Sequence, residues 1–129
     1  MRITKPEKCY VFARNAVRQG HPDLALEAYR RAVDLRARDY ETDCEMEHAA
    51  VRAIYAYEEA LSYARGKRTR ATGTWQVVQS QGVVEAVQKR LHSRNRDEVE
   101  QVLAELGMED YTFGAFCNAY PEAFSRAAA

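Results

Sequence analysis

Glycine and proline are scarce in this chain, with 6 glycines and 3 prolines among 129 residues. A β-sandwich or β-barrel needs many short turns, and these two residues supply most of the turn signals. Their scarcity therefore argues against an all-β fold. The length suits one ordinary domain and is too short for two comfortable ones. We predict a single all-α domain over residues 1–129.

Long apolar runs and cysteines are also few. No stretch approaches the roughly 20 apolar residues that a membrane span requires, and the first residues lack the apolar region of a signal peptide. We therefore expect a cytoplasmic protein without a membrane partner. The three cysteines, Cys9, Cys44 and Cys117, are odd in number and widely spaced. This pattern suits reduced, partly buried thiols better than a disulfide framework.

Net charge is absent because 19 basic side chains balance 19 acidic ones. The balance hides four blocks: residues 1–38 and 64–96 are net basic, whereas residues 39–63 and 97–129 are net acidic. Such blocks either pair acidic helices with basic ones inside the molecule or mark a surface for a charged partner. They can also complement each other across a two-fold axis, so a homodimer is an open alternative.

Apolar residues that recur every three or four positions predict six to seven helices. The run Thr4-Lys-Pro-Glu7 has the spacing of a capping box and predicts that the first helix begins near residue 5. Gly20 predicts its end, because a left-handed residue after a helix is least costly as glycine. An antiparallel second helix follows. The longest uninterrupted pattern then predicts a long third helix over residues 39–65.

The region after the third helix divides into a loop and a cluster of short helices. Residues 66–73 are basic and polar with no apolar period, so we expect an exposed loop between the 1–65 subregion and the rest. Residues 74–129 predict a smaller helical cluster in which Trp75 is a core anchor. Phe124 is expected to pack back on it before a frayed end.

Small residues, a glycine and an aromatic recur through the first two predicted helices. They are Ala13, Gly20, Ala25, Tyr29 and Ala32. Their spacing resembles a tetratricopeptide repeat over residues 5–38. The resemblance implies a hairpin of two closely packed helices whose groove receives peptide segments. Because a lone repeat cannot bury its open face, we expect the third helix to cover it.

The leading functional hypothesis is a non-catalytic binding or adaptor protein for a protein or peptide partner. It rests on the repeat-like hairpin, the charge blocks and the lack of a catalytic constellation. An open, partly apolar groove between the first two helices and the third would support it. If Ala16, Ala25 and Tyr29 were sealed beneath the third helix, no groove would remain.

Two clusters of cations on either side of residues 74–91 favour an alternative, a small nucleic-acid-binding protein. The candidate contacts are Arg65, Lys67, Arg68, Arg70, Lys89, Arg90, Arg94 and Arg96. These side-chain types contact phosphates, and an exposed Trp75 could stack on a base. Residues 74–91 also resemble a helix-turn-helix with Gly82 in the turn, although Gln88 departs from it. That resemblance implies a recognition helix after Gly82.

Metal and catalytic motifs receive little support. Glu45-x-x-His48 places a carboxylate and an imidazole together on a helix, as in di-iron bundles, but such sites need a second pair and further glutamates. We therefore predict no metal and no cofactor. The histidines and cysteines show no local pairing of a nucleophile with a base, and no glycine-rich phosphate loop follows a strand. We predict that the protein is not an enzyme.

Overall fold

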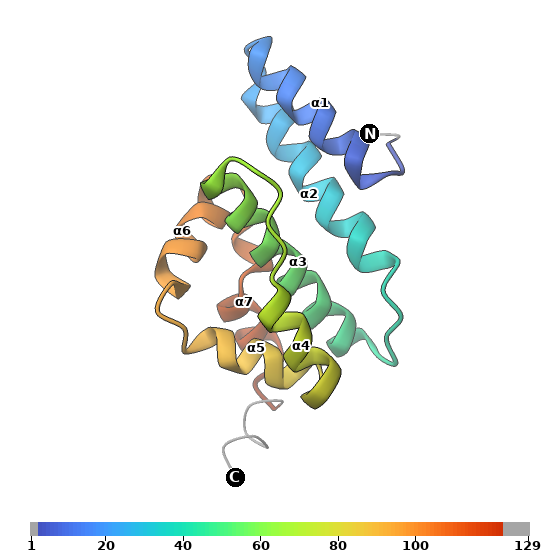
Figure 1. The fold of residues 1–129 in the computed structure, drawn as a ribbon, viewed down its shortest axis with the longest axis vertical. Coiled ribbons are helices and arrows are strands. Elements are labelled where there is room, and N and C mark those ends of the chain that lie inside the picture. The colour runs from blue at the N-terminus through green and yellow to red at the C-terminus, as the bar shows by residue number, and fades with distance from the viewer. Residues whose placement is uncertain (1–2, 123–129) are drawn as a thin grey trace.

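The computed structural model describes residues 3–122, and its regular elements are all helical (Figure 1), which confirms the predicted all-α class. In chain order they are α1 (Pro6–Arg18), α2 (Pro22–Arg38), α3 (Glu45–Arg65), α4 (Thr72–Gln81), α5 (Val83–Leu91), α6 (Arg96–Glu105), the 3₁₀ turn η1 (Glu109–Tyr111) and α7 (Phe113–Ala119). No helix in this part of the chain combines the length and the apolar character needed to cross a bilayer. The expected packing of Phe124 lies outside the described residues.

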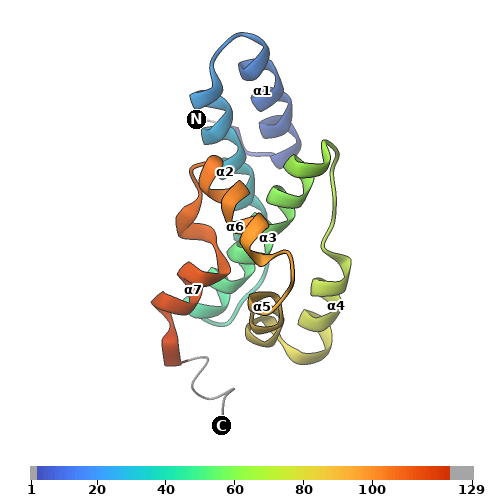
Figure 2. The ribbon, with the colours of Figure 1, turned by 90° about the vertical axis from the view of Figure 1, so that its left-hand side faces the viewer.

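Helices α1 and α2 form an antiparallel hairpin that extends beyond the other helices in both ribbon views (Figures 1 and 2). Its turn contains Gly20 at φ 80°, as predicted for the end of the first helix. The buried residues between the two helices are mostly alanine: Cys9, Ala13, Ala16, Ala25, Ala28, Ala32 and Leu35. Side chains this short let the two helices approach closely.

The start of α1 differs from the predicted capping box. The N-cap residue is Lys5, and no side chain caps the helix. Pro6 occupies the first helical position, where its fixed φ is already helical and its missing N–H costs nothing. Thr4 therefore stands one residue too early to act as the cap. Glu7 still lies in the first turn and complements the positive end of the helix dipole.

Helix α3 begins at Glu45, six residues later than the predicted start at residue 39. Residues 39–44 instead form the connection in which the chain turns from α2 into α3. Cys44 has an extended backbone with φ −154° and is exposed, so the expectation of a partly buried thiol is wrong for this residue. Alternating acidic residues before Glu45 suit a helix start as well as a connection, so the pattern alone did not separate the two.

Helix α3 lies at the centre of the fold, between α2 on one side and the short helices on the other (Figure 1). Val51 and Ile54 are completely buried, and Tyr57 is almost so. Helix α3 therefore covers the hairpin on one side only, because α2 is the helix of the hairpin that it mainly contacts. Ala16 and Ala25 are buried within the hairpin core.

Trp75 anchors α4 to α3, as predicted for a core residue. Its side chain is 8% exposed, and its ring lies 5.5 Å from the ring of Tyr40 and 4.9 Å from that of Tyr55. Its Nε1–H donates to Glu58 Oε2 at 2.7 Å, so its polar atom is satisfied as well. Trp75 is consequently not available to stack on a base.

Candidate binding cleft

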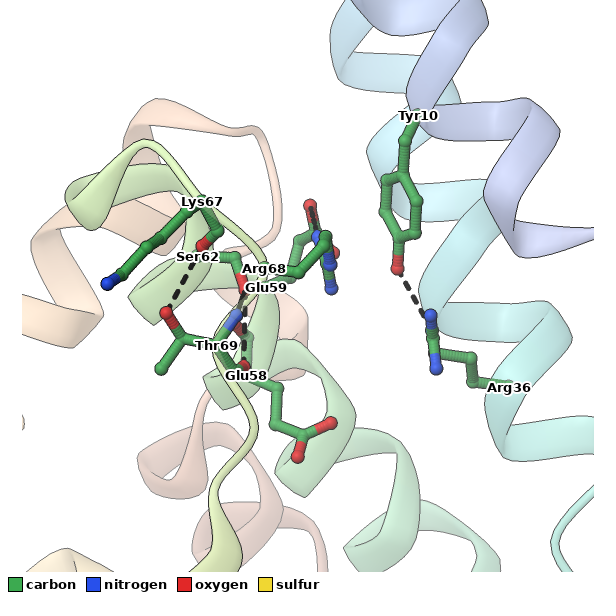
Figure 3. A network of polar contacts seen from close by, with 8 residues as sticks. All are labelled: Tyr10, Arg36, Glu58, Glu59, Ser62, Lys67, Arg68 and Thr69. Carbon is green, nitrogen blue, oxygen red and sulfur yellow. Dashed lines mark hydrogen bonds and ion pairs between the residues drawn. The ribbon is translucent and has the colours of Figure 1, made fainter.

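A cleft of about 430 Å³ lies between the hairpin and the C-terminal end of α3. It is lined by Tyr10, Arg14, Tyr29, Glu59, Ser62, Tyr63, Gly66, Lys67 and Arg68. We call it the tyrosine cleft. Figure 3 shows its floor, where Tyr10 extends from the hairpin toward Arg68 and Glu59. The groove expected between the first two helices and the third is therefore present.

Helical spacing explains how the two walls arise. Tyr10 and Arg14 lie one turn apart on α1, each next to a buried position of the hairpin core. On α3, Glu59, Ser62 and Tyr63 are spaced by three and four residues and share one face. The hairpin core is too thin to fill the space between these faces, so a cleft remains.

Glu58 and Ser62 fix the chain that follows α3, so the predicted exposed loop has a defined path. Glu58 Oε2 accepts hydrogen bonds from the backbone N–H of Ala71 and from Trp75 Nε1–H, both at 2.7 Å. The backbone N–H of Thr69 donates to Ser62 Oγ at 2.9 Å, and the Ser62 hydroxyl donates to the carbonyl of Glu58 at 2.8 Å. These hydrogen bonds fix the backbone of the loop at Thr69 and Ala71.

Glu59 is the second of two consecutive buried glutamates. Arg68 Nη1 donates to both of its carboxylate oxygens, at 3.1 and 3.3 Å, and the Arg68 guanidinium also lies 3.9 Å from the centre of the Tyr10 ring. Burial raises the pKa of Glu59 above its usual value, and Arg68 opposes that shift. Burial, assisted by the charge of Glu59, raises the pKa of Tyr10 to about 12.

The rim of the tyrosine cleft is cationic and aromatic. Arg14 and Lys67 are exposed, and neither forms an ion pair within residues 3–122. Tyr29 and Tyr63 meet edge to face, with 5.9 Å between ring centres, and Tyr63 remains 49% exposed. The cleft thus offers aromatic surface and two uncompensated positive charges.

The first predicted cation cluster, at residues 65–70, surrounds this region. Lys67 and Arg68 line the tyrosine cleft, whereas Arg70 faces a second opening that Arg68 also lines. Arg65 is exposed at the end of α3 and lines neither. The structure therefore brings three of the four residues together around two adjoining openings.

The second predicted cluster lies on α5, on the connection after it and at the first residue of α6, away from the hairpin in Figure 1. Its members are Lys89, Arg90, Arg94 and Arg96. Arg90 donates to the Tyr57 hydroxyl at 3.3 Å, and Arg96 pairs with Glu100 at 3.2 Å. Lys89 and Arg94 are exposed. Two of the four residues therefore already have structural contacts.

The predicted helix-turn-helix corresponds to α4 and α5. Gly82, at φ 96°, is the only residue between them. Helix α5 packs against both α3 and α7, and Val87 is completely buried. These contacts bury one face of α5, whereas Lys89 on the same helix is exposed.

Three cleft residues were not predicted from the sequence, namely Tyr10, Arg14 and Glu59. One signal was available: Glu58 and Glu59 follow Tyr57 on the otherwise apolar central part of α3. Charged side chains are almost never fully buried without a partner. Two consecutive carboxylates at that place therefore indicate donors brought in from elsewhere in the chain.

Potential metal ligands do not gather in the described part of the chain. Within residues 3–122, no group of three or more histidine, cysteine, aspartate or glutamate side chains is placed to hold an ion. Glu45 is exposed at the first turn of α3, and His48 is half-buried one turn later. The tyrosine cleft therefore remains the candidate site.

Comparison of the chain with protein-family models, with curated proteins and with solved structures finds no match. The resemblance of residues 5–38 to a tetratricopeptide repeat accordingly stays a prediction.

Proposed function

We propose that this protein is a non-catalytic binding module that receives a peptide segment of a protein partner in the tyrosine cleft. The observation that carries the proposal is the cleft itself, which has about 430 Å³ of space between the hairpin and α3. Its tyrosine walls suit a peptide because tyrosine provides large contact area at a low cost in conformational entropy.

Charge favours an acidic peptide. Arg14 and Lys67 at the rim have no ion pair among the described residues. Glu59, at the floor, is compensated by Arg68 and adds little repulsion. A peptide with carboxylates at the rim and an apolar or aromatic side chain against Tyr29 and Tyr63 would match both features.

A random-peptide display library selected on the intact protein tests this proposal. We expect enriched sequences to combine acidic residues with an apolar or aromatic residue. The enriched peptide should bind the Arg14→Gln/Lys67→Gln double variant about tenfold more weakly than the wild type, equivalent to about 1.4 kcal/mol. Arg18→Gln changes an exposed arginine one turn beyond Arg14 and serves as the matched control, with affinity within about twofold.

Two results would overturn the peptide proposal. One is enrichment of basic sequences, which the cationic rim should repel. The other is equal affinity of the enriched peptide for the wild type and for the double variant, because the peptide would then bind elsewhere. Tyr29→Ala adds an uncharged test, since loss of a cleft wall should also weaken binding.

Nucleic-acid binding remains the second candidate because Arg65, Lys67 and Arg70 are exposed, close in sequence and without ion pairs in the described chain. Titration with duplex and single-stranded DNA at low and moderate salt tests it. Phosphate contacts predict affinity that falls steeply with salt. A lack of binding at low salt, or binding unchanged by replacement of all three residues with glutamine, would exclude this candidate.

A further inference from the structure

Three arginines line a second opening next to the tyrosine cleft. It holds about 220 Å³ and is lined by Arg36, Tyr55, Glu58, Arg68, Thr69 and Arg70. We call it the arginine pocket. Arg36 comes from α2, whereas Arg68 and Arg70 come from the loop after α3. We propose that this pocket binds the phosphate group of a phosphate monoester.

Tyr10 holds two of the three arginines. Arg36 Nε donates to the Tyr10 hydroxyl at 2.9 Å, and its guanidinium lies 5.6 Å from the ring centre. The Arg68 guanidinium lies 3.9 Å from the same ring. In Figure 3, Tyr10 and Arg36 project from the hairpin toward the side on which Arg68 and Glu58 lie. Two cations are thus fixed near each other before any ligand arrives.

These anchoring contacts use only some of the guanidinium N–H groups of Arg36 and Arg68. Within residues 3–122, both Nη groups of Arg36 lack a protein acceptor, as do Nε and Nη2 of Arg68. Arg70 is exposed and makes no side-chain hydrogen bond or ion pair there. Guanidinium groups suit phosphate because their planar forks donate parallel hydrogen bonds to pairs of oxygens.

A second tyrosine in this protein also lies between two arginines, and it provides a contrast. The Tyr111 ring centre is 4.8 Å from the guanidinium of Arg30 and 4.7 Å from that of Arg52. There the charges are compensated, because Asp110 pairs with Arg30 at 2.7 Å and Asp34 accepts the Tyr111 hydroxyl hydrogen bond. The charges of the two arginines at that site are therefore balanced by Asp110 and Asp34.

The arginine pocket has three arginines and only two carboxylates beside them among the described residues. Glu59 pairs with Arg68. Among residues 3–122, Glu58 is the only carboxylate that lines the pocket, and its Oε2 accepts hydrogen bonds from two N–H donors. Arg36 and Arg70 have no ion pair in the described chain. When the negative charge of Glu58 is subtracted from the positive charges of Arg36 and Arg70, one positive charge remains. A phosphate monoester offers three acceptor oxygens to the free guanidinium N–H groups, whereas a carboxylate offers two.

Titration of the intact protein, labelled with ¹⁵N at arginine, tests the proposal by NMR at constant ionic strength. The four probes are inorganic phosphate, phenyl phosphate, dimethyl phosphate and acetate. We expect phosphate and phenyl phosphate to cause saturable shifts of the Nε–H signals of Arg36, Arg68 and Arg70. Their affinity should exceed that of dimethyl phosphate and acetate by about tenfold or more, because only the first two carry a second charge near neutral pH.

Substitution of single arginines tests whether the phosphate binds in the arginine pocket. Arg70→Gln alters a side chain without internal contacts, so it should fold normally and bind phenyl phosphate about tenfold more weakly. Arg36→Gln should have a similar effect. Arg65→Gln, outside the pocket, is the control and should remain within about twofold of the wild type.

Several outcomes would overturn the proposal: shifts that do not saturate, equal affinity for all four probes, or unchanged affinity in Arg70→Gln. Tightest binding of dimethyl phosphate would also overturn it and would favour a nucleic-acid backbone instead. Inorganic phosphate binding alone, without phenyl phosphate, would show an ion site that excludes esters and would contradict the monoester assignment. None of these results depends on the peptide proposed for the tyrosine cleft.

Discussion

The α1–α2 hairpin and the helices α3 to α7 are packed with different side chains. The buried residues of the hairpin are mostly alanines, whereas the core around α3 contains Ile54, Met108 and Phe113. A thin core of small side chains holds two helices close together but offers little apolar surface to a third element. This difference indicates why helices α3 to α7 form a well-filled bundle, whereas the junction between this bundle and the hairpin contains a cleft.

Polar contacts make up much of that junction. Arg30 on α2 pairs with Asp110 at 2.7 Å and donates to the carbonyl of Gly107 at 3.1 Å. The Tyr111 hydroxyl donates to Asp34 on the same helix. Val33 of α2 also reaches the core around α3. The hairpin is thus attached along α2, and the part of α1 that carries Tyr10 is left beside the cleft.

The largest expected effect tests the bundle core. Ile54→Ala removes a completely buried side chain, so the free energy of unfolding should fall by about 2–5 kcal/mol. Urea denaturation measures the change. Leu24→Ala, at a partly exposed position of the hairpin, is the control and should cost less than about 1.5 kcal/mol. Equal losses in both variants would break the distinction between the two regions.

The hairpin should instead be sensitive to added volume. Ala28 is completely buried between α1 and α2, and Ala28→Leu should lower the free energy of unfolding by about 1–3 kcal/mol because the helices must separate. Ala104→Leu adds the same volume on the exposed side of α6 and should change it by less than about 0.5 kcal/mol. A neutral Ala28→Leu would mean that the two helices are not closely packed.

The polar junction predicts a smaller effect. Tyr111→Phe removes the hydroxyl that donates to Asp34 while keeping the ring against Arg30 and Arg52, and it should cost about 1–2 kcal/mol. Tyr120→Phe is a suitable control because no hydrogen bond of the Tyr120 hydroxyl occurs within residues 3–122. A double-mutant cycle with Asp34→Asn measures the coupling, and zero coupling would remove this contact from the junction.

The smallest effect concerns Glu59 at the floor of the cleft. Its pKa is raised above 4.5 by burial, so the folded protein binds this proton more tightly than the unfolded chain does. The resulting stabilisation is present below pH 4.5 and is lost as the pH rises through the folded-state pKa. As the pH rises from 4.5 to the folded-state pKa of Glu59, the free energy of unfolding of the wild type should fall relative to that of Glu59→Gln. The fall should be at most about 1.4 kcal/mol per pH unit. Chemical denaturation across this range measures the difference, and a pH-independent difference would contradict the assignment.

The hairpin and the packing of Trp75 could be predicted from the sequence because both depend on local patterns. Gly20 ends α1 where a left-handed residue is needed, and apolar residues repeat at helical spacing on both sides of it. The start of α3 could not be located, because acidic residues favour a helix start and an exposed connection alike. Periodicity shows which face of a helix is buried and gives little information about which helix covers it.

The candidate sites were harder to predict because they depend on contacts between distant segments. Arg68 was predicted to contact a partner, and its pairing with Glu59 and Tyr10 follows only from the folded chain. Arg36 belonged to no predicted cluster, since its role depends on the Tyr10 hydroxyl of another helix. The sequence could indicate the type of the loop residues, but their partners required the fold.

The central claim is that the junction between the hairpin and the bundle is the binding surface. Backbone amide NMR shifts, recorded while the enriched acidic peptide is added, test it most directly. The largest changes should fall at Tyr10, Arg14, Tyr29, Tyr63 and Lys67, on both walls of the tyrosine cleft. Changes confined to α5 and α6, with the cleft residues unmoved, would contradict the claim.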